Sequence, residues 1–205
     1  MNTKFQVLKL FASLLRYPGR EYASTVESLL DELDESSPAH TALNELLKFV
    51  RGKSRLQLEE EFTHTFDINA AVSLDVGFHL FGLAYKRGEF LVKVREALRE
   101  AGLNEGTELP DHLPNLLELA AAMDEERATA LVQECIFPAI QRMTGVVTAG
   151  GFHLALIALR VFLDEHFRCV VLLFEQSDEA RAATGDYVYA PMELDELQTG
   201  VARHE

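Results

Sequence analysis

Apolar residues recur along this chain at the three- and four-residue spacings that place side chains on one face of an α-helix. Segments with the two-residue alternation of paired strands are absent, and no internal repeat appears. The segments predicted to be helical are residues 4–15, 22–33, 39–50, 54–66, 73–82, 88–101, 113–120, 124–143 and 150–174. The sequence therefore predicts an all-α fold, a single-domain bundle of roughly eight or nine helices.

Particular residues mark the ends of these helices. Ser54 and Ser73 each precede a helical segment and are expected to cap it, while Gly102 ends the amphipathic segment over residues 88–101. The segment over residues 150–174 is apolar on nearly all sides until Asp164, which is typical of a helix in the middle of a bundle. We expect residues 1–176 to form the helical domain and residues 177–205 to be an acidic, flexible tail.

The charge balance restricts the partners of the chain. It carries 33 acidic against 19 basic residues, a net charge of −14. Such a field repels the phosphates of nucleic acids and anionic lipids, and it attracts basic partners. We therefore expect no nucleic-acid binding.

Cysteine usage and hydropathy indicate a cytoplasmic protein. Cys135 and Cys169 lie 34 positions apart without a C-x-x-C motif, so we expect two buried, reduced thiols. Lys9 and Arg16 interrupt the apolar residues near the N-terminus, which argues against a signal peptide. The longest uncharged run, residues 143–159, falls short of the about 20 apolar residues of a transmembrane helix.

Few motifs for chemistry are present. The phosphate-binding glycine motifs are absent. Glu61 and His64 form one Glu-x-x-His, the spacing of di-iron helical bundles, but such bundles need a second copy and two further glutamates. We interpret the pair as a surface pair and predict no metal site. A metal-dependent helical enzyme remains the alternative.

A stiff corner is predicted at residues 108–114. Pro110 and Pro114 flank Asp111 and His112, and Pro114 is compatible with a first helical turn. Asp111 is expected to cap the helix that follows, an interpretation we favour over catalysis because no serine or cysteine nucleophile accompanies the pair.

This corner carries a family resemblance. The run ELPDHLP, followed by Leu117-Glu118-Leu119, resembles the signature of the NarJ-type nitrate reductase assembly chaperones, within the wider TorD/DmsD-like group that matures molybdenum enzymes. The resemblance covers residues 8–120. Stretches that agree in order and spacing are LLRYP at residues 14–18, EEFTHTFD at residues 60–67, Ser73-Leu74, His79, Phe81-Gly82 and Arg87-Gly88. The chain departs from the family at Asp75-Val76-Gly77, where an apolar or aromatic run is usual, and at Leu83.

The resemblance implies a system-specific chaperone and not an enzyme. Family members bind the basic N-terminal leader of the catalytic (alpha) subunit of a molybdenum oxidoreductase. They hold this apoenzyme while molybdopterin guanine dinucleotide and an iron–sulfur cluster are inserted, and they keep no cofactor themselves. Respiratory nitrate reductase is the first choice of client. Related enzymes acting on selenate, chlorate, dimethyl sulfide or hydrocarbons remain alternatives, as does a general adaptor unrelated to molybdenum enzymes.

A helical bundle can offer an apolar groove to a client helix, and an acidic rim favours a basic leader. The candidate peptide-binding residues are Phe62, Phe66, His79, Phe81, Glu108, Asp111, His112, Pro114 and Glu118. The alternative is that the aromatic residues merely fill the core. We expect alanine at Asp111 or His112 to weaken leader binding with little change in thermal stability. Titration of His112 would make affinity vary between about pH 5 and 8. Helix exchange offers a route to a homodimer.

Overall fold

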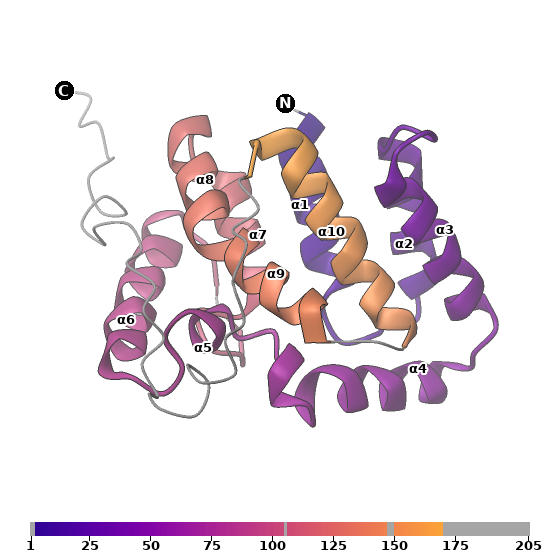
Figure 1. Ribbon diagram of the computed structural model, residues 1–205, viewed down its shortest axis with the longest axis horizontal. Coiled ribbons are helices and arrows are strands. Elements are labelled where there is room, and N and C mark those ends of the chain that lie inside the picture. The colour runs from indigo at the N-terminus through magenta and orange to yellow at the C-terminus, as the bar shows by residue number, and fades with distance from the viewer. Residues whose placement is uncertain (1–2, 105, 147–149, 170–205) are drawn as a thin grey trace.

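The computed structural model describes residues 3–104, 106–146 and 150–169, and helices joined by short turns make up this part (Figure 1). They are α1 Thr3–Leu14, α2 Tyr22–Glu32, α3 Pro38–Arg51, α4 Arg55–Phe62, α5 Val76–Phe81, α6 Tyr85–Glu100, α7 Leu113–Ala122, α8 Glu125–Leu131, α9 Phe137–Val146 and α10 Gly151–Phe167. A π-helical turn, Val132–Ile136, joins α8 to α9, and another, Thr63–Asp67, continues α4. Apart from a short 3-10 helix at Ala70–Val72, the described residues thus form nine continuous helical segments and no strand, which confirms the predicted all-α single domain.

Helix caps explain several boundaries. Ser54 and Gln57 form a reciprocal capping box at the start of α4, as expected from Ser54. Ser73 does not cap a helix. Its hydroxyl accepts a hydrogen bond from the backbone of Asp75 at 3.3 Å, and α5 begins only at Val76.

Two other predicted helix boundaries were also wrong. The helix expected to start at Gly88 begins at Tyr85, because the chain leaves α5 through Gly82 at a φ of 60° and re-enters helical geometry directly afterwards. Gly88 therefore lies inside α6. The helix expected to reach residue 174 ends at Phe167, where Arg168 takes a left-handed conformation with a φ of 52°.

The core is built around α10, which lies between α3 and α9 and beside α1 in Figure 1. The burial of α10 agrees with its apolar sequence. Phe152 lies at the centre of an aromatic cluster, with its ring 5.3 Å from Phe62, 5.8 Å from Tyr22 and 6.0 Å from Phe49 and Phe66, between centroids. This cluster joins α2, α3, α4 and α10.

Other expectations concern the termini and the cysteines. Cys135 and Cys169 are free and buried, as expected. No helix among the described residues is long and apolar enough to span a bilayer. The predicted tail over residues 177–205 lies outside the described residues.

Candidate functional site

Two segments far apart in the sequence meet at the ELPDHLP run. Asp75 and His112 form an isolated antiparallel β-bridge, in which Val76 donates its backbone N–H to Asp111 (3.0 Å) and Leu113 donates to Leu74 (2.8 Å). The bridge holds the start of α5 against the start of α7. We call residues 73–77, Arg87 and residues 108–115 the corner.

Asp111 is fully buried and caps a different helix from the one expected. Its Oδ2 atom accepts from the backbone N–H of Gly77 at 3.1 Å, and its carbonyl accepts from Val76, so it serves the first two residues of α5. His112 occupies the cap position of α7 without a capping side-chain hydrogen bond. The prediction that Asp111 caps its own helix was wrong, because the bridge brings its carboxylate to the start of α5.

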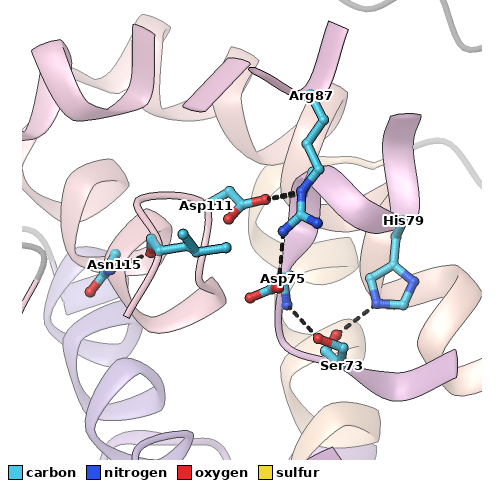
Figure 2. Close-up of polar contacts among 8 residues, drawn as sticks. Ser73, Asp75, His79, Arg87, Asp111 and Asn115 are labelled. Atoms are coloured by element: carbon cyan, nitrogen blue, oxygen red, sulfur yellow. Dashed lines mark hydrogen bonds and ion pairs between the residues drawn. The ribbon is translucent and has the colours of Figure 1, made fainter. Parts of the chain in front are cut away.

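Arg87 connects the two aspartates of the corner (Figure 2). Its Nε atom donates to Asp111 at 3.2 Å, and Nη2 donates to Asp75 at 2.9 Å. A guanidinium presents several donors in a fixed plane, which suits this two-sided contact. Sequence reasoning noted Arg87 only as part of the resemblance. Arg87 lies in the first turn of α6, where the helix dipole favours anions, so a cation at this position needs an acidic partner. This position is the signal that could have marked Arg87.

Gly77 is required by the close approach of Asp111. A Cβ atom at this position would lie 2.5 Å from Asp111 Oδ2 and 3.0 Å from the ring of Phe90. The departure from the family pattern at residues 75–77 therefore has a structural role here: Asp75 binds Arg87, and Gly77 leaves room for the buried carboxylate.

Burial controls the protonation of the corner. Desolvation raises the pKa of Asp111, although the charge of Arg87 acts in the opposite direction. Within the described residues, the Oδ1 atom of Asp111 has no hydrogen-bond partner. Desolvation also lowers the pKa of His112, and Glu108 and Asp75 oppose that shift.

His79 is buried beside the corner on α5. Its ring donates through Nε2 to the carbonyl of Ser73 at 2.7 Å, and its own carbonyl accepts a hydrogen bond from Arg142 of α9. Burial lowers the pKa of His79. The residue thus ties α5 both to the corner and to the bundle.

The predicted aromatic residues lie in the core, in two separate clusters. Phe62 and Phe66 belong to the cluster around Phe152, whereas Phe81 packs against Phe90 with ring centroids 5.4 Å apart. Pro114 is also buried, in the first turn of α7. Among the predicted residues, Glu108 is exposed and His112 and Glu118 are half-buried.

Arg16 links the end of α1 to α7. Arg16 donates to Glu118 at 3.0 Å and to the side chain of Asn115 at 3.4 Å. Asn115, labelled in Figure 2, donates in turn to the carbonyl of Leu109 at 3.1 Å. The LLRYP and ELPDHLP stretches are therefore connected through side chains.

The family model for the nitrate reductase delta subunit matches residues 32–148, which include the whole corner. The chain belongs to the nitrate reductase delta subunit family. It is 27% identical, over 140 residues, to the probable nitrate reductase molybdenum cofactor assembly chaperone NarJ of Bacillus subtilis (strain 168), covering 65% of this chain and 76% of that protein.

This delta-family chain is also 28% identical, over 120 residues, to the nitrate reductase-like protein NarX of two Mycobacterium tuberculosis strains. That match covers 58% of this chain but 18% of NarX, so the chain spans less than a fifth of that relative.

The described residues of this delta-family chain contain no group of three or more metal-ligating side chains. Glu61 accepts from Lys53 at 2.9 Å, and His64 is exposed. Neither residue belongs to the corner. At the corner, the hydrogen bonds and charges of Asp111 and Arg87 hold α5, α6 and α7 together.

Proposed function

We propose that this chain is a non-enzymatic, system-specific chaperone that binds the N-terminal leader of the catalytic subunit of a molybdenum oxidoreductase, with respiratory nitrate reductase as the first choice of client. The client would receive its molybdopterin guanine dinucleotide and iron–sulfur cluster while it is held. Membership in the delta subunit family and the name of the Bacillus subtilis relative support this proposal.

The observation that carries the binding site is an exposed apolar surface at the corner. Tyr17, Ile68 and Leu109 are 56%, 70% and 44% exposed, respectively. We call these three residues, with His112, the corner surface. Large apolar side chains that remain exposed are the groups through which a domain binds other polypeptides, and we propose that these three act together.

The charged neighbours of these apolar residues support their grouping with His112. Each of the three apolar residues is adjacent in sequence to a charged one, namely Arg16, Asp67 and Glu108. All three charges act on the imidazole of His112, although they come from the end of α1, the end of the π-helical turn and the corner. Arg16 also contacts Asn115 and Glu118 of α7, which supports grouping these segments with the corner.

The acidic character of the chain favours a basic leader. The net charge of −14 attracts a peptide that carries arginine or lysine, and Asp67 and Glu108 supply negative charge beside the corner surface. Apolar residues of the leader would then cover Tyr17, Ile68 and Leu109, in the manner of an amphipathic helix on an apolar surface.

We propose that the predicted site residues divide by role. Glu108, His112 and Glu118 are accessible and would contact the leader directly. The others, Phe62, Phe66, His79, Phe81, Asp111 and Pro114, are buried and would act by positioning the segments that carry the corner surface.

Calorimetry with a synthetic leader peptide of the candidate catalytic subunit tests the proposal. Replacing Ile68 and Leu109 with serine should weaken binding at least tenfold, because each buried aliphatic side chain contributes about 1.5–3 kcal/mol. Leu56→Ser is the matched control, since Leu56 is 64% exposed on α4 and lies outside the corner surface. Equal losses in the two variants would remove the corner surface from the site.

The identity of the client needs a separate experiment. Tagged chain, purified from cells that express molybdenum enzymes, should bring down one large iron–sulfur catalytic subunit, identified by mass spectrometry. Selenate, chlorate, dimethyl sulfide or hydrocarbon enzymes would replace nitrate reductase as client if their subunit were found. Failure of the chain to bind any such subunit or its leader would contradict the proposed function.

A further inference from the structure

The ion pair between Arg16 and Glu118 is made through a single nitrogen atom. Nη2 of Arg16 donates to Oε1 of Glu118 at 3.0 Å and to the side-chain oxygen of Asn115 at 3.4 Å. With the described residues, the other guanidinium nitrogens of Arg16 and Oε2 of Glu118 make no hydrogen bond. A guanidinium can bind a carboxylate through two parallel hydrogen bonds, so this pair uses only part of the capacity of both groups.

Arg87 provides a contrast within the same molecule. It donates from two nitrogens to two carboxylates, those of Asp75 and Asp111, and the side chain of Asp111 is fully buried. The side chains of Arg16 and Glu118 are instead 40% and 29% exposed. Partly exposed ion pairs contribute little to stability, whereas breaking a pair that involves a buried carboxylate is costly. The pair between Arg16 and Glu118 can therefore open at little cost.

Opening this pair leaves the corner surface in place. The ring of Tyr17 packs edge to face against Phe62, with centroids 5.6 Å apart. The carbonyl of Leu109 accepts one hydrogen bond from Asn115 and another from the backbone N–H of His112, each at 3.1 Å. None of these contacts involves the arginine of the pair, so its release does not remove the support of Tyr17 or Leu109.

We propose that Glu118 is the acceptor for an arginine side chain of the leader, and that Arg16 occupies this acceptor until the leader binds. The inference rests on the proposed function, because it assigns a partner to one of the residues proposed to contact the leader. Arg16 is then an internal substitute for a basic residue of the leader. Binding exchanges one guanidinium for another and releases Arg16 to the solvent.

The charges near His112 fit such an exchange. Burial lowers the pKa of His112, and the charge of Arg16 acts in the same direction. The acidic residues Glu108, Asp75 and Asp67 oppose this shift. Arg16 is therefore a cation in otherwise negative surroundings, where a basic leader is proposed to bind.

The acceptors on α7 favour arginine over lysine. Asn115 and Glu118 are three residues apart, so their side chains share one face of the helix, and both reach the same nitrogen of Arg16. An incoming guanidinium can bind both oxygens of Glu118 and still donate to Asn115. An ammonium group lacks this planar arrangement of donors.

Calorimetry with the synthetic leader peptide tests the exchange through the sign of one effect. Arg16→Gln removes the competing guanidinium, so it should tighten leader binding by about twofold to fivefold, the range that corresponds to a partly exposed ion pair. Arg20→Gln is the matched control, since it makes the same charge change at an exposed arginine in the turn before α2. It should alter affinity by less than about 1.5-fold, because salt screens exposed charges.

Two results of this comparison overturn the exchange. Equal gains in Arg16→Gln and Arg20→Gln would attribute the effect to the net charge of the chain. Weaker binding by Arg16→Gln would instead make Arg16 a residue that positions the corner surface.

Glu118→Gln tests the acceptor. It should weaken leader binding at least about fivefold, because a charge-assisted hydrogen bond is lost. In a chain that already carries Glu118→Gln, adding Arg16→Gln should give no gain, since the two residues act on one contact. An undiminished gain in the double variant would overturn the assignment of Glu118.

Replacing the basic residues of the leader by glutamine, one at a time, locates the partner of Glu118. At one position the replacement should remove the advantage of Arg16→Gln over the wild type, and arginine there should bind more tightly than lysine. A leader in which no single position has this effect would overturn the exchange.

Thermal midpoints test the premise that the pair opens easily. Arg16→Gln should lower the midpoint much less than Arg87→Gln, and equal losses would contradict the exchange. If neither the wild type nor Arg16→Gln binds any leader, the proposed function fails and this inference fails with it. If both bind with equal affinity, the inference alone is overturned.

Discussion

Two glycines allow close contacts in two different regions of this molecule. An aromatic ring approaches Gly151, and a carboxylate approaches Gly77. Gly151, at the start of α10, faces the ring of Phe49 on α3, where a Cβ atom would collide with the ring carbons. Gly77, at the start of α5, faces the carboxylate of Asp111, where a Cβ atom would lie 2.5 Å from oxygen. The first contact is between apolar groups, and the second is a hydrogen-bonded ion-pair network.

The two regions differ in what holds them together. Around Phe152, apolar area is buried and aromatic rings pack edge to face, so the free energy there depends on shape and little on pH. At the corner, a buried carboxylate is held by Arg87 and by the backbone N–H of Gly77, so the geometry depends on specific partners and on protonation. The corner also contains Leu109, which is 44% exposed.

The largest effect should come from the apolar region. Phe152→Ala removes a fully buried ring that contacts four other aromatic rings, so we expect a loss of about 3–5 kcal/mol in the free energy of unfolding. Urea unfolding at pH 5 and at pH 7 measures this loss. The difference from the wild type should be equal at both pH values, and a strongly pH-dependent difference would contradict the apolar description of this region.

The next effect comes from the corner. Asp111→Ala leaves Arg87 with one aspartate and the start of α5 without its side-chain cap, so we expect a loss of about 2–4 kcal/mol. This expected loss replaces the expectation from the sequence that Asp111→Ala leaves the thermal melt nearly unchanged, because Asp111 is buried and bonded to two other elements. Asp111→Asn, which retains an oxygen acceptor, should lose less. Equal unfolding midpoints for wild type and Asp111→Ala would show that the network contributes nothing to stability.

Sequence reasoning succeeded in the apolar region because its signal is local. The spacing of Phe5, Leu8, Phe11 and Leu15 places them on one side of α1 and of the turn that follows it, and all but Phe5 are fully buried. A Ser54 cap likewise depends on a residue three positions away. Helix existence and most of the core follow from such short-range patterns.

The corner could be located from the sequence but its contacts could not. The prolines marked a stiff turn at residues 108–114, whereas the partners of Asp111 lie 24 and 34 positions earlier, at Arg87 and Gly77. No periodicity encodes a contact over that distance. Asp111 was therefore assigned to the nearest helix, and the role of Arg87 was missed.

A smaller loss is expected for Gly77→Ala. The added methyl group must displace Asp111 Oδ2 or the buried ring of Phe90, so we expect a loss of about 1–3 kcal/mol. Gly88→Ala is the matched control with the opposite sign, because its Cβ atom meets open space in a helix and should stabilise by up to about 1 kcal/mol. Calorimetric melts of both variants measure the contrast, and a stabilising Gly77→Ala would refute the close approach of Asp111.

The smallest effect, and the one that connects the corner to recognition, concerns the charge of His112. Burial lowers the pKa of His112, so the folded chain favours the neutral ring. As the pH falls below about 6.5, the unfolded chain takes up this proton first and stability decreases. His112→Gln should remove this part of the pH dependence, a change below about 1 kcal/mol for a half-buried group.

Leader binding should follow the same titration. A protonated His112 would place a positive charge beside Asp67 and Glu108, whose negative charges are proposed to attract a basic leader. Affinity should therefore fall between pH 7 and pH 5 in the wild type and less in His112→Gln, measured by calorimetry at each pH. His64→Gln, at an exposed histidine outside the corner, controls for general histidine effects. A flat profile in the wild type would leave His112 as a cap-position residue with no part in recognising the leader.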